Sequence, residues 1–305
     1  MSDYSRKREL YINNWPDSIP FEVEQEYMNK CRSFLTESGK HVFYPMKVWQ
    51  DDNIGYQRDI SHIIQSLEMM PFFPNNAFLF IFSGLDYWEK RTYSDKNTTK
   101  NLKKSIEEIN VLALSNDDVA EVIEVLYNIV PFRAVNYLFE KLLSKPEIAA
   151  RVSSDGNGQP ILGYKQLIDE INQRYTVKTP NNIRNGSMLY RHLLTSKEIT
   201  LSGNTVAVPN ELKLRIALLG LVYSLRNDFA HGSAMASTKS SKTTIARYSM
   251  QFYCFLLTYT LFMLLLILHS DMSDQEKNRI YADLKSTTIQ NTYSFRLLFG
   301  HNLTK

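Results

Sequence analysis

Apolar residues recur at helical spacing over most of the chain beyond residue 54. Residues 55–70 are typical, because four apolar side chains share one helical face and the pattern stops before Pro71. These four are Ile60, Ile63, Ile64 and Leu67. The same kind of pattern predicts further helices over residues 75–91, 101–114, 117–130, 132–143, 163–175 and 211–232.

Polar residues at the ends of these stretches indicate where the helices begin. Asn75 or Asn76 is placed to cap the second helix, since an amide oxygen accepts hydrogen bonds from the first turn. Asp117 and Asp118 open a later helix, where acidic side chains favour the N-terminus. Within the second stretch the run FLFIF (78–82) also fits a buried strand, so the pattern leaves both structures open there.

Strand signals are few. HVFYPMKVW (41–49) is aromatic and β-branched, and Pro45 restricts it to an edge or irregular strand. EITLSGNTVAVP (198–209) predicts a small hairpin turning at Ser-Gly-Asn, and SSDGNGQP (153–160) predicts a loop. We therefore expect a mostly α protein, with a helical domain over 71–305 that carries a small β-hairpin insertion. A mixed α/β N-terminal segment, 1–70, is expected to pack on that domain as a cap.

The segment 248–270 contains no charged residue, and residues 255–268 are almost continuously apolar. It is long enough to span a bilayer, so a membrane-anchored effector is one possible class. Polar residues interrupt the segment, however, and no second span accompanies it. A helix that is apolar all round also suits the centre of a bundle or a dimer interface, and the sequence favours these over a membrane segment. We expect part of this helix in a two-fold interface.

Composition changes this picture little. Hydrophobic residues make up 44% and charged residues 22%, which excludes a disordered chain. The net charge of +3 is too small to identify a nucleic-acid binder, so affinity for phosphate would have to come from a local patch. Cys31 and Cys254 have no metal-ligand spacing, and the basic N-terminus lacks the apolar core of a signal peptide. We expect a cytoplasmic protein.

The stretch R-N-D-F-A-H (226–231) is the most informative for chemistry. Arg226 and His231 point about 140° apart on a regular helix, so a direct bond between them is not expected. Asn227 and His231 share a face, so the amide could orient the imidazole. The negative end of the helix dipole favours the protonated form of His231. A helix end that carries these cations and opens into a flexible loop suits a phosphodiester. The structural alternative is a simple C-terminal cap, with Asp228 on the surface and Gly232 ending the helix.

Other candidate residues lie near this stretch. Lys239 and Lys242 follow it among hydroxyl side chains and could bind RNA phosphates; a solvated linker is the alternative. Asp86 could face the motif as an acidic partner or be a surface charge. The histidines have no metal-binding spacing, and no phosphate-binding glycine loop occurs, so neither a metal nor a cofactor is expected.

The hexapeptide R-N-D-F-A-H, at the end of a hydrophobic helix and followed by a second long apolar helix, resembles the signature of the HEPN superfamily. The resemblance implies a helical bundle over about 75–270 that forms a homodimer. It also implies a metal-independent ribonuclease of a toxin or antiphage system, working with a cognate antitoxin or defence partner. By this resemblance Arg226 would stabilise the phosphate, His231 would transfer a proton and Asn227 would orient groups. Ser233 stands where one subgroup has tyrosine, which argues against modification by a nucleotidyltransferase antitoxin.

Two functional hypotheses follow. The first is an endoribonuclease in which the ribose 2′-OH attacks the phosphate at a site composed of two motifs across a dimer. One chain supplies a single motif histidine, whereas the reaction needs a base and an acid, so a two-fold dimer would complete the pair. The alternative is a non-catalytic module that binds RNA or mediates dimerisation.

Overall fold

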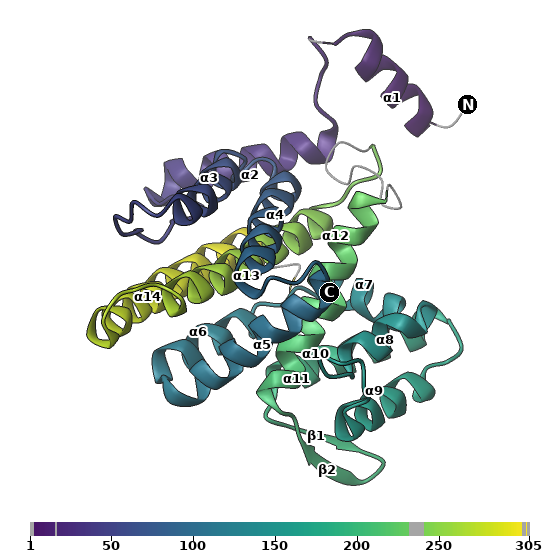
Figure 1. The fold of residues 1–305 in the computed structure, drawn as a ribbon. Helices are drawn as coiled ribbons and strands as arrows, with labels where there is room; N and C mark the ends of the chain where they lie inside the picture. The colour runs from purple at the N-terminus through teal and green to yellow at the C-terminus, as the bar shows by residue number, and fades with distance from the viewer. Residues whose placement is uncertain (1–2, 16, 232–240, 301–302, 304–305) are drawn as a thin grey trace.

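The structure is a computed structural model that describes residues 3–15, 17–231, 241–300 and 303 (Figure 1). Over these residues the chain is mostly helical with one two-stranded antiparallel sheet. The helices are α1 (Asp3–Asn13), α2 (Glu22–Ser38), α3 (Ile54–Glu68), α4 (Pro74–Tyr93), α5 (Thr98–Ser115), α6 (Asp117–Tyr127), α7 (Phe132–Ser144), α8 (Pro146–Val152), α9 (Leu162–Arg174), α10 (Pro180–Thr195), α11 (Asn210–Arg215), the π-helical segment η1 (Ile216–Val222), α12 (Tyr223–Ala230), α13 (Ile245–Leu268) and α14 (Asp274–Phe299). The strands are β1 (Glu198–Leu201) and β2 (Asn204–Ala207).

Helix α13 forms the centre of the molecule (Figure 1). It is long and apolar enough to cross a membrane, but 94% of its most apolar window is buried inside the protein. Helices α4 and α14 pack along it, and α2, α5 and α7 also contact it. The bundle-centre interpretation of segment 248–270 therefore holds. The expectation that α13 contributes to a two-fold interface is wrong, because its own chain covers it on nearly every side.

The segment 41–53 forms neither a helix nor a strand, so the expected edge strand at 41–49 is wrong. Its apolar residues instead pack on the central helix. The Phe43 ring lies 5.1 Å from that of Phe255, and the amide of Met46 donates a hydrogen bond to the hydroxyl of Tyr259 at 2.9 Å. Helices α1, α2 and α3 make up the ordered secondary structure of the described residues before 70, which corrects the mixed α/β expectation.

The predicted helices within 55–175 are present, and FLFIF lies within α4. Helix α4 begins at Pro74 after Phe73, so neither Asn75 nor Asn76 is its cap. A proline suits the first turn because its missing N–H would have no helical acceptor there. The same feature starts α8 and α10, which the apolar pattern did not reveal.

The predicted hairpin is present, and its turn has positive φ at Ser202 and Gly203. Two positive φ values in a two-residue turn match the right-handed twist of the paired strands. The predicted loop 153–160 is closed by an isolated bridge between Ser154 and Pro160.

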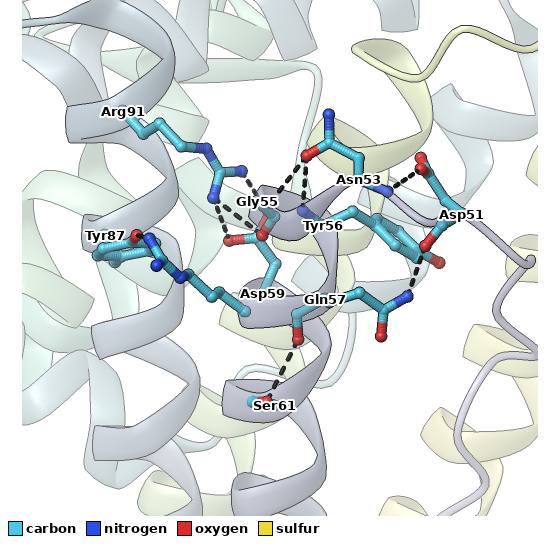
Figure 2. Close-up of polar contacts among 10 residues, drawn as sticks. Asp51, Asn53, Gly55, Tyr56, Gln57, Asp59, Ser61, Tyr87 and Arg91 are labelled. Atoms are coloured by element: carbon cyan, nitrogen blue, oxygen red, sulfur yellow. Dashed lines mark hydrogen bonds and ion pairs between the residues drawn. The ribbon is translucent and has the colours of Figure 1, made fainter.

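An ion pair joins α3 to α4 (Figure 2). The Arg91 guanidinium donates to both carboxylate oxygens of Asp59, at 2.6 and 3.3 Å, and to the carbonyl of Gly55 at 2.9 Å. A side chain at Gly55 would displace this guanidinium, since an added Cβ would lie 2.8 Å from its Cζ. The carboxylate of Asp59 is almost fully buried, so this contact is part of the core.

Candidate functional site

The R-N-D-F-A-H stretch occupies the last turns of α12, as the sequence predicts. Arg226 is half-buried, with its guanidinium carbon 5.6 Å from the centre of the Phe82 ring on α4. One guanidinium nitrogen donates to the amide oxygen of Asn227 at 3.1 Å. Both contacts are to uncharged groups, and no ion pair joins Arg226 to an acid among the described residues. Its positive charge is therefore held in place without being neutralised.

His231 ends α12 and is exposed to solvent. Its backbone amide donates to the carbonyl of Asn227 at 3.0 Å, which closes the last turn. The Asn227 amide oxygen contacts Arg226, so the expected orientation of the imidazole by this amide is not seen. Gly232, the predicted cap, lies outside the described residues.

Asp228 is buried, which corrects the expectation that it lies on the surface. Its Oδ2 accepts a hydrogen bond from the Tyr137 hydroxyl at 2.8 Å and pairs with the Lys141 ammonium at 2.5 Å. Both partners come from α7. Burial raises the pKa of Tyr137, and the hydrogen bond to Asp228 raises it further, so the phenol remains a donor. The one acid of the motif is thus turned away from Arg226 and neutralised.

A π-helical segment, η1, lies directly before the motif helix. Arg151 of α8 donates to the carbonyl of Leu219 within η1, at 2.8 and 3.1 Å, and to the Ser224 hydroxyl at 2.7 Å. Its guanidinium also lies 4.7 Å from the Tyr223 ring centre. π-Helical turns are often retained at functional sites. Arg151 fixes the segment from which the motif helix continues.

The remaining sequence candidates have different outcomes. Lys239 lies outside the described residues, whereas Lys242 is exposed shortly before α13. Asp86 bonds to Lys90 at 2.7 Å and to Thr98 at 2.7 Å, so it belongs to the contact between α4 and α5 and not to the motif. Cys31 and Cys254 are buried free thiols.

Residues from other helices support the motif, and the sequence did not predict them. Phe82, Tyr137 and Lys141 contact it from α4 and α7. They lie about 85 or more positions away along the chain, so no local spacing could have indicated them. Asp228 is a charged residue near the end of a helix, a pattern typical of a surface residue. Its burial was therefore not predicted.

Within the described part of the chain, no group of three or more His, Cys, Asp or Glu side chains is arranged to hold a metal ion. Comparisons with protein-family models, with curated proteins and with solved structures gave no match for this chain. The arrangement itself can bind an anion: a cation, Arg226, and an exposed imidazole, His231, stand at one helix end.

Proposed function

We propose that this protein is an endoribonuclease of the HEPN type, which cuts RNA without a metal at a site composed of two motifs in a homodimer. The observation that carries the proposal is the uneven distribution of charge in the motif. Asp228 is neutralised by Lys141, while Arg226, as far as the structure describes the chain, has the Phe82 ring and the Asn227 amide as partners and no acid, and His231 is exposed. A phosphodiester would meet positive charge and a proton-transfer group without a competing carboxylate. Such an activity would suit a toxin or an antiphage system with a cognate partner.

The chemistry follows from the two side chains. A histidine removes the proton of the ribose 2′-OH, and the oxygen attacks the phosphorus. The bond from phosphorus to the 5′-oxygen breaks, and a second histidine protonates that leaving oxygen. The products are a 2′,3′-cyclic phosphate and a 5′-hydroxyl. Arg226 stabilises the charge on the phosphorane, and the second chain supplies the second His231 and Arg226.

The N-terminal segment offers a surface for the dimer. Helix α1 stands away from the body of the protein (Figure 1), and Ile12, Trp15 and Ile19 are 73%, 73% and 78% exposed. A groove of about 760 Å³ runs between α1 and the start of α2, and Ser241 also lines it. Ser241 belongs to the segment that connects the motif to α13. A second copy docked on this apolar surface would contact the segment that leads from the motif into α13.

The test is to incubate purified protein with single-stranded RNA in excess EDTA and to analyse the product ends. The proposal expects cuts that leave 2′,3′-cyclic phosphate or 3′-phosphate together with 5′-hydroxyl. Products with 3′-hydroxyl ends and a strict magnesium requirement would contradict it. RNA binding without cleavage would favour the non-catalytic RNA-binding module. The oligomer is measured in parallel by sedimentation, where Trp15→Glu should weaken the dimer and lower the rate of cleavage with it.

A further inference from the structure

Four side chains from three helices connect α8 to the motif arginine. The Arg151 guanidinium lies 4.7 Å from the centre of the Tyr223 ring. The centre of that ring lies 6.3 Å from the centre of the Phe82 ring, and the two ring planes are tilted by 34°. The Arg226 guanidinium lies 5.6 Å from the centre of the same Phe82 ring. These distances are within the range of cation–π and aromatic contacts, so each side chain contacts the next.

The end of this series at Arg151 is tied to the backbone. Arg151 donates two hydrogen bonds to the carbonyl of Leu219 in η1 and one to the hydroxyl of Ser224 in α12. Its guanidinium therefore has a fixed place against the Tyr223 ring, which is half-buried at the start of α12. That ring in turn contacts Phe82, a fully buried residue of α4.

The other end of the series, Arg226, has fewer contacts. Among the described residues it has one hydrogen bond, to the Asn227 amide, and the Phe82 ring. Tyr223 and Arg226 are three residues apart on α12, so they are neighbours on one helix face. A long arginine side chain loses much rotational freedom when it is held in one place. The aromatic contacts are therefore the main support for the position of this charge.

We propose that Arg151 and Tyr223 are positioning residues, which act through Phe82 to hold the Arg226 guanidinium where the phosphorane forms. The inference rests on the proposed function and adds two residues outside the motif hexapeptide to its site. Neither residue needs to touch RNA, because each acts through the placement of Arg226. A displacement of about 1 Å can lower a rate roughly 100-fold, so the loss of this support should be measurable.

The first test is RNA cleavage in EDTA, with kcat and KM measured separately. Tyr223→Leu should lower kcat roughly tenfold to 100-fold with little change in KM, because Arg226 acts on the charge of the phosphorane. Tyr223→Phe, which keeps the ring, should retain most of the parental kcat. In an Arg226→Ala background, Tyr223→Leu should lower kcat no further, since the residue through which it acts is absent. An equal loss of kcat in both backgrounds would overturn the inference, as would a parental kcat in Tyr223→Leu.

Arg151→Met extends this test to the far end of the series. Its kcat should also fall in the parent and not in the Arg226→Ala background. Its melting temperature should fall in both backgrounds, because the carbonyl of Leu219 loses its side-chain donors either way. A purely structural role for Arg151 would give no such separation between kcat and stability. Should Arg151→Met fail to fold, Tyr223→Leu still decides the question, because Tyr223 is only half-buried.

The second test follows Arg226 itself and does not depend on cleavage. In protein labelled with nitrogen-isotope arginine, the Nε–Hε signal of Arg226 in NMR spectra is assigned by its loss in Arg226→Lys. Tyr223→Leu should shift and sharpen this signal, because the guanidinium leaves the Phe82 ring and becomes mobile.

The matched control is Tyr164→Leu. Tyr164 is also half-buried, and its ring centre lies 6.0 Å from the Arg215 guanidinium, but it belongs to α9, which packs on α8 and α10. This change should leave kcat and the Arg226 signal as in the parent. An Arg226 signal that does not respond to Tyr223→Leu would overturn the inference. If the signal responds but the parent protein never cuts RNA, the contacts that position Arg226 stand and the proposed nuclease fails.

Discussion

Arg91 and Arg226 both lie beside an aromatic ring of α4, but the Arg91 guanidinium is paired with a carboxylate, whereas that of Arg226 has no acidic partner among the described residues. The Arg91 guanidinium is 5.6 Å from the Tyr87 ring centre and forms two bonds to the buried carboxylate of Asp59 (Figure 2). The Arg226 guanidinium is 5.6 Å from the Phe82 ring centre, and its one hydrogen bond among the described residues goes to the neutral Asn227 amide. The first arginine therefore stabilises the packing of α3 on α4. The second keeps its charge available to an anion from outside.

The acidic residues next to these arginines explain the difference. Burial raises the pKa of Asp59, while the Arg91 hydrogen bonds oppose that rise. Asp59 thus needs Arg91 in order to stay ionised in the core. Asp228, the acid closest in sequence to Arg226, takes its cation from α7 instead. Lys141 therefore forms an ion pair with the acid of the motif, and the arginine of the motif has no acidic partner among the described residues.

The largest expected effect on stability is that of Arg91→Ala. This change leaves the Asp59 carboxylate buried without its cation, and breaking such a pair costs about 3 kcal/mol when one partner is partly exposed. Chemical denaturation should show this loss, whereas Arg226→Ala should change the free energy of unfolding by less than about 1 kcal/mol. Equal losses from the two substitutions would remove the contrast between the two arginines.

The next effect concerns the acid of the motif. Asp228→Ala leaves the Lys141 ammonium and the Tyr137 hydroxyl without their shared acceptor, so the free energy of unfolding should fall by about 1–3 kcal/mol. Urea denaturation measures this change. A double-mutant cycle with Lys141→Met should recover part of the loss, because the unpaired cation is then absent. An unchanged midpoint for Asp228→Ala would mean that the acid is a surface residue after all.

A third prediction uses Glu89 of α4, which is fully buried and accepts a hydrogen bond from Ser105 at 2.6 Å. Burial raises the pKa of Glu89 to about 8, so it is protonated in the folded protein at neutral pH. In the unfolded chain the Glu89 carboxyl has the ordinary pKa of glutamate, about 4.3, and is ionised above that pH. Folding stability should therefore fall as the pH rises from about 4.3 to 8, by at most about 1.4 kcal/mol per pH unit from this group, and then level off.

Glu89→Gln should remove that contribution and stabilise the protein at pH 7 relative to the parent. Thermal melts between pH 4.5 and 8 measure it, with Glu26→Gln, an exposed acid on α2, as the control. If the difference between parent and Glu89→Gln does not grow with pH, Glu89 is not protonated in the fold.

The sequence predicted the parts of this structure that depend on local spacing. Helical periodicity found α3 to α7, α9 and the helix that carries the motif, and the turn residues found the hairpin. Helical periodicity did not predict α8 and α10, which begin at Pro146 and Pro180. A proline is found both where a helix ends and in the first turn of a helix, so its presence does not show that a helix begins there. The aromatic run 41–49 fitted a strand, but its side chains pack on α13 and its backbone pairs with no strand.

For the site, the motif and its place at the end of a helix could be predicted from the sequence. The surroundings could not, because they depend on contacts between distant helices. Phe82 under Arg226 and the pair of Tyr137 and Lys141 around Asp228 arise only when α4, α7 and α12 pack together.

The most direct test of the central claim is the rate of RNA cleavage in EDTA by His231→Ala, measured beside its melting temperature. We predict a loss of about 100-fold or more, the usual effect of removing a proton-transfer group, with a melting temperature within a few degrees of the parent. The control is His192→Ala, an exposed histidine in the last turn of α10, which should cut RNA as the parent does. A His231→Ala protein that cuts RNA at the parental rate would contradict the account and leave only the helical fold.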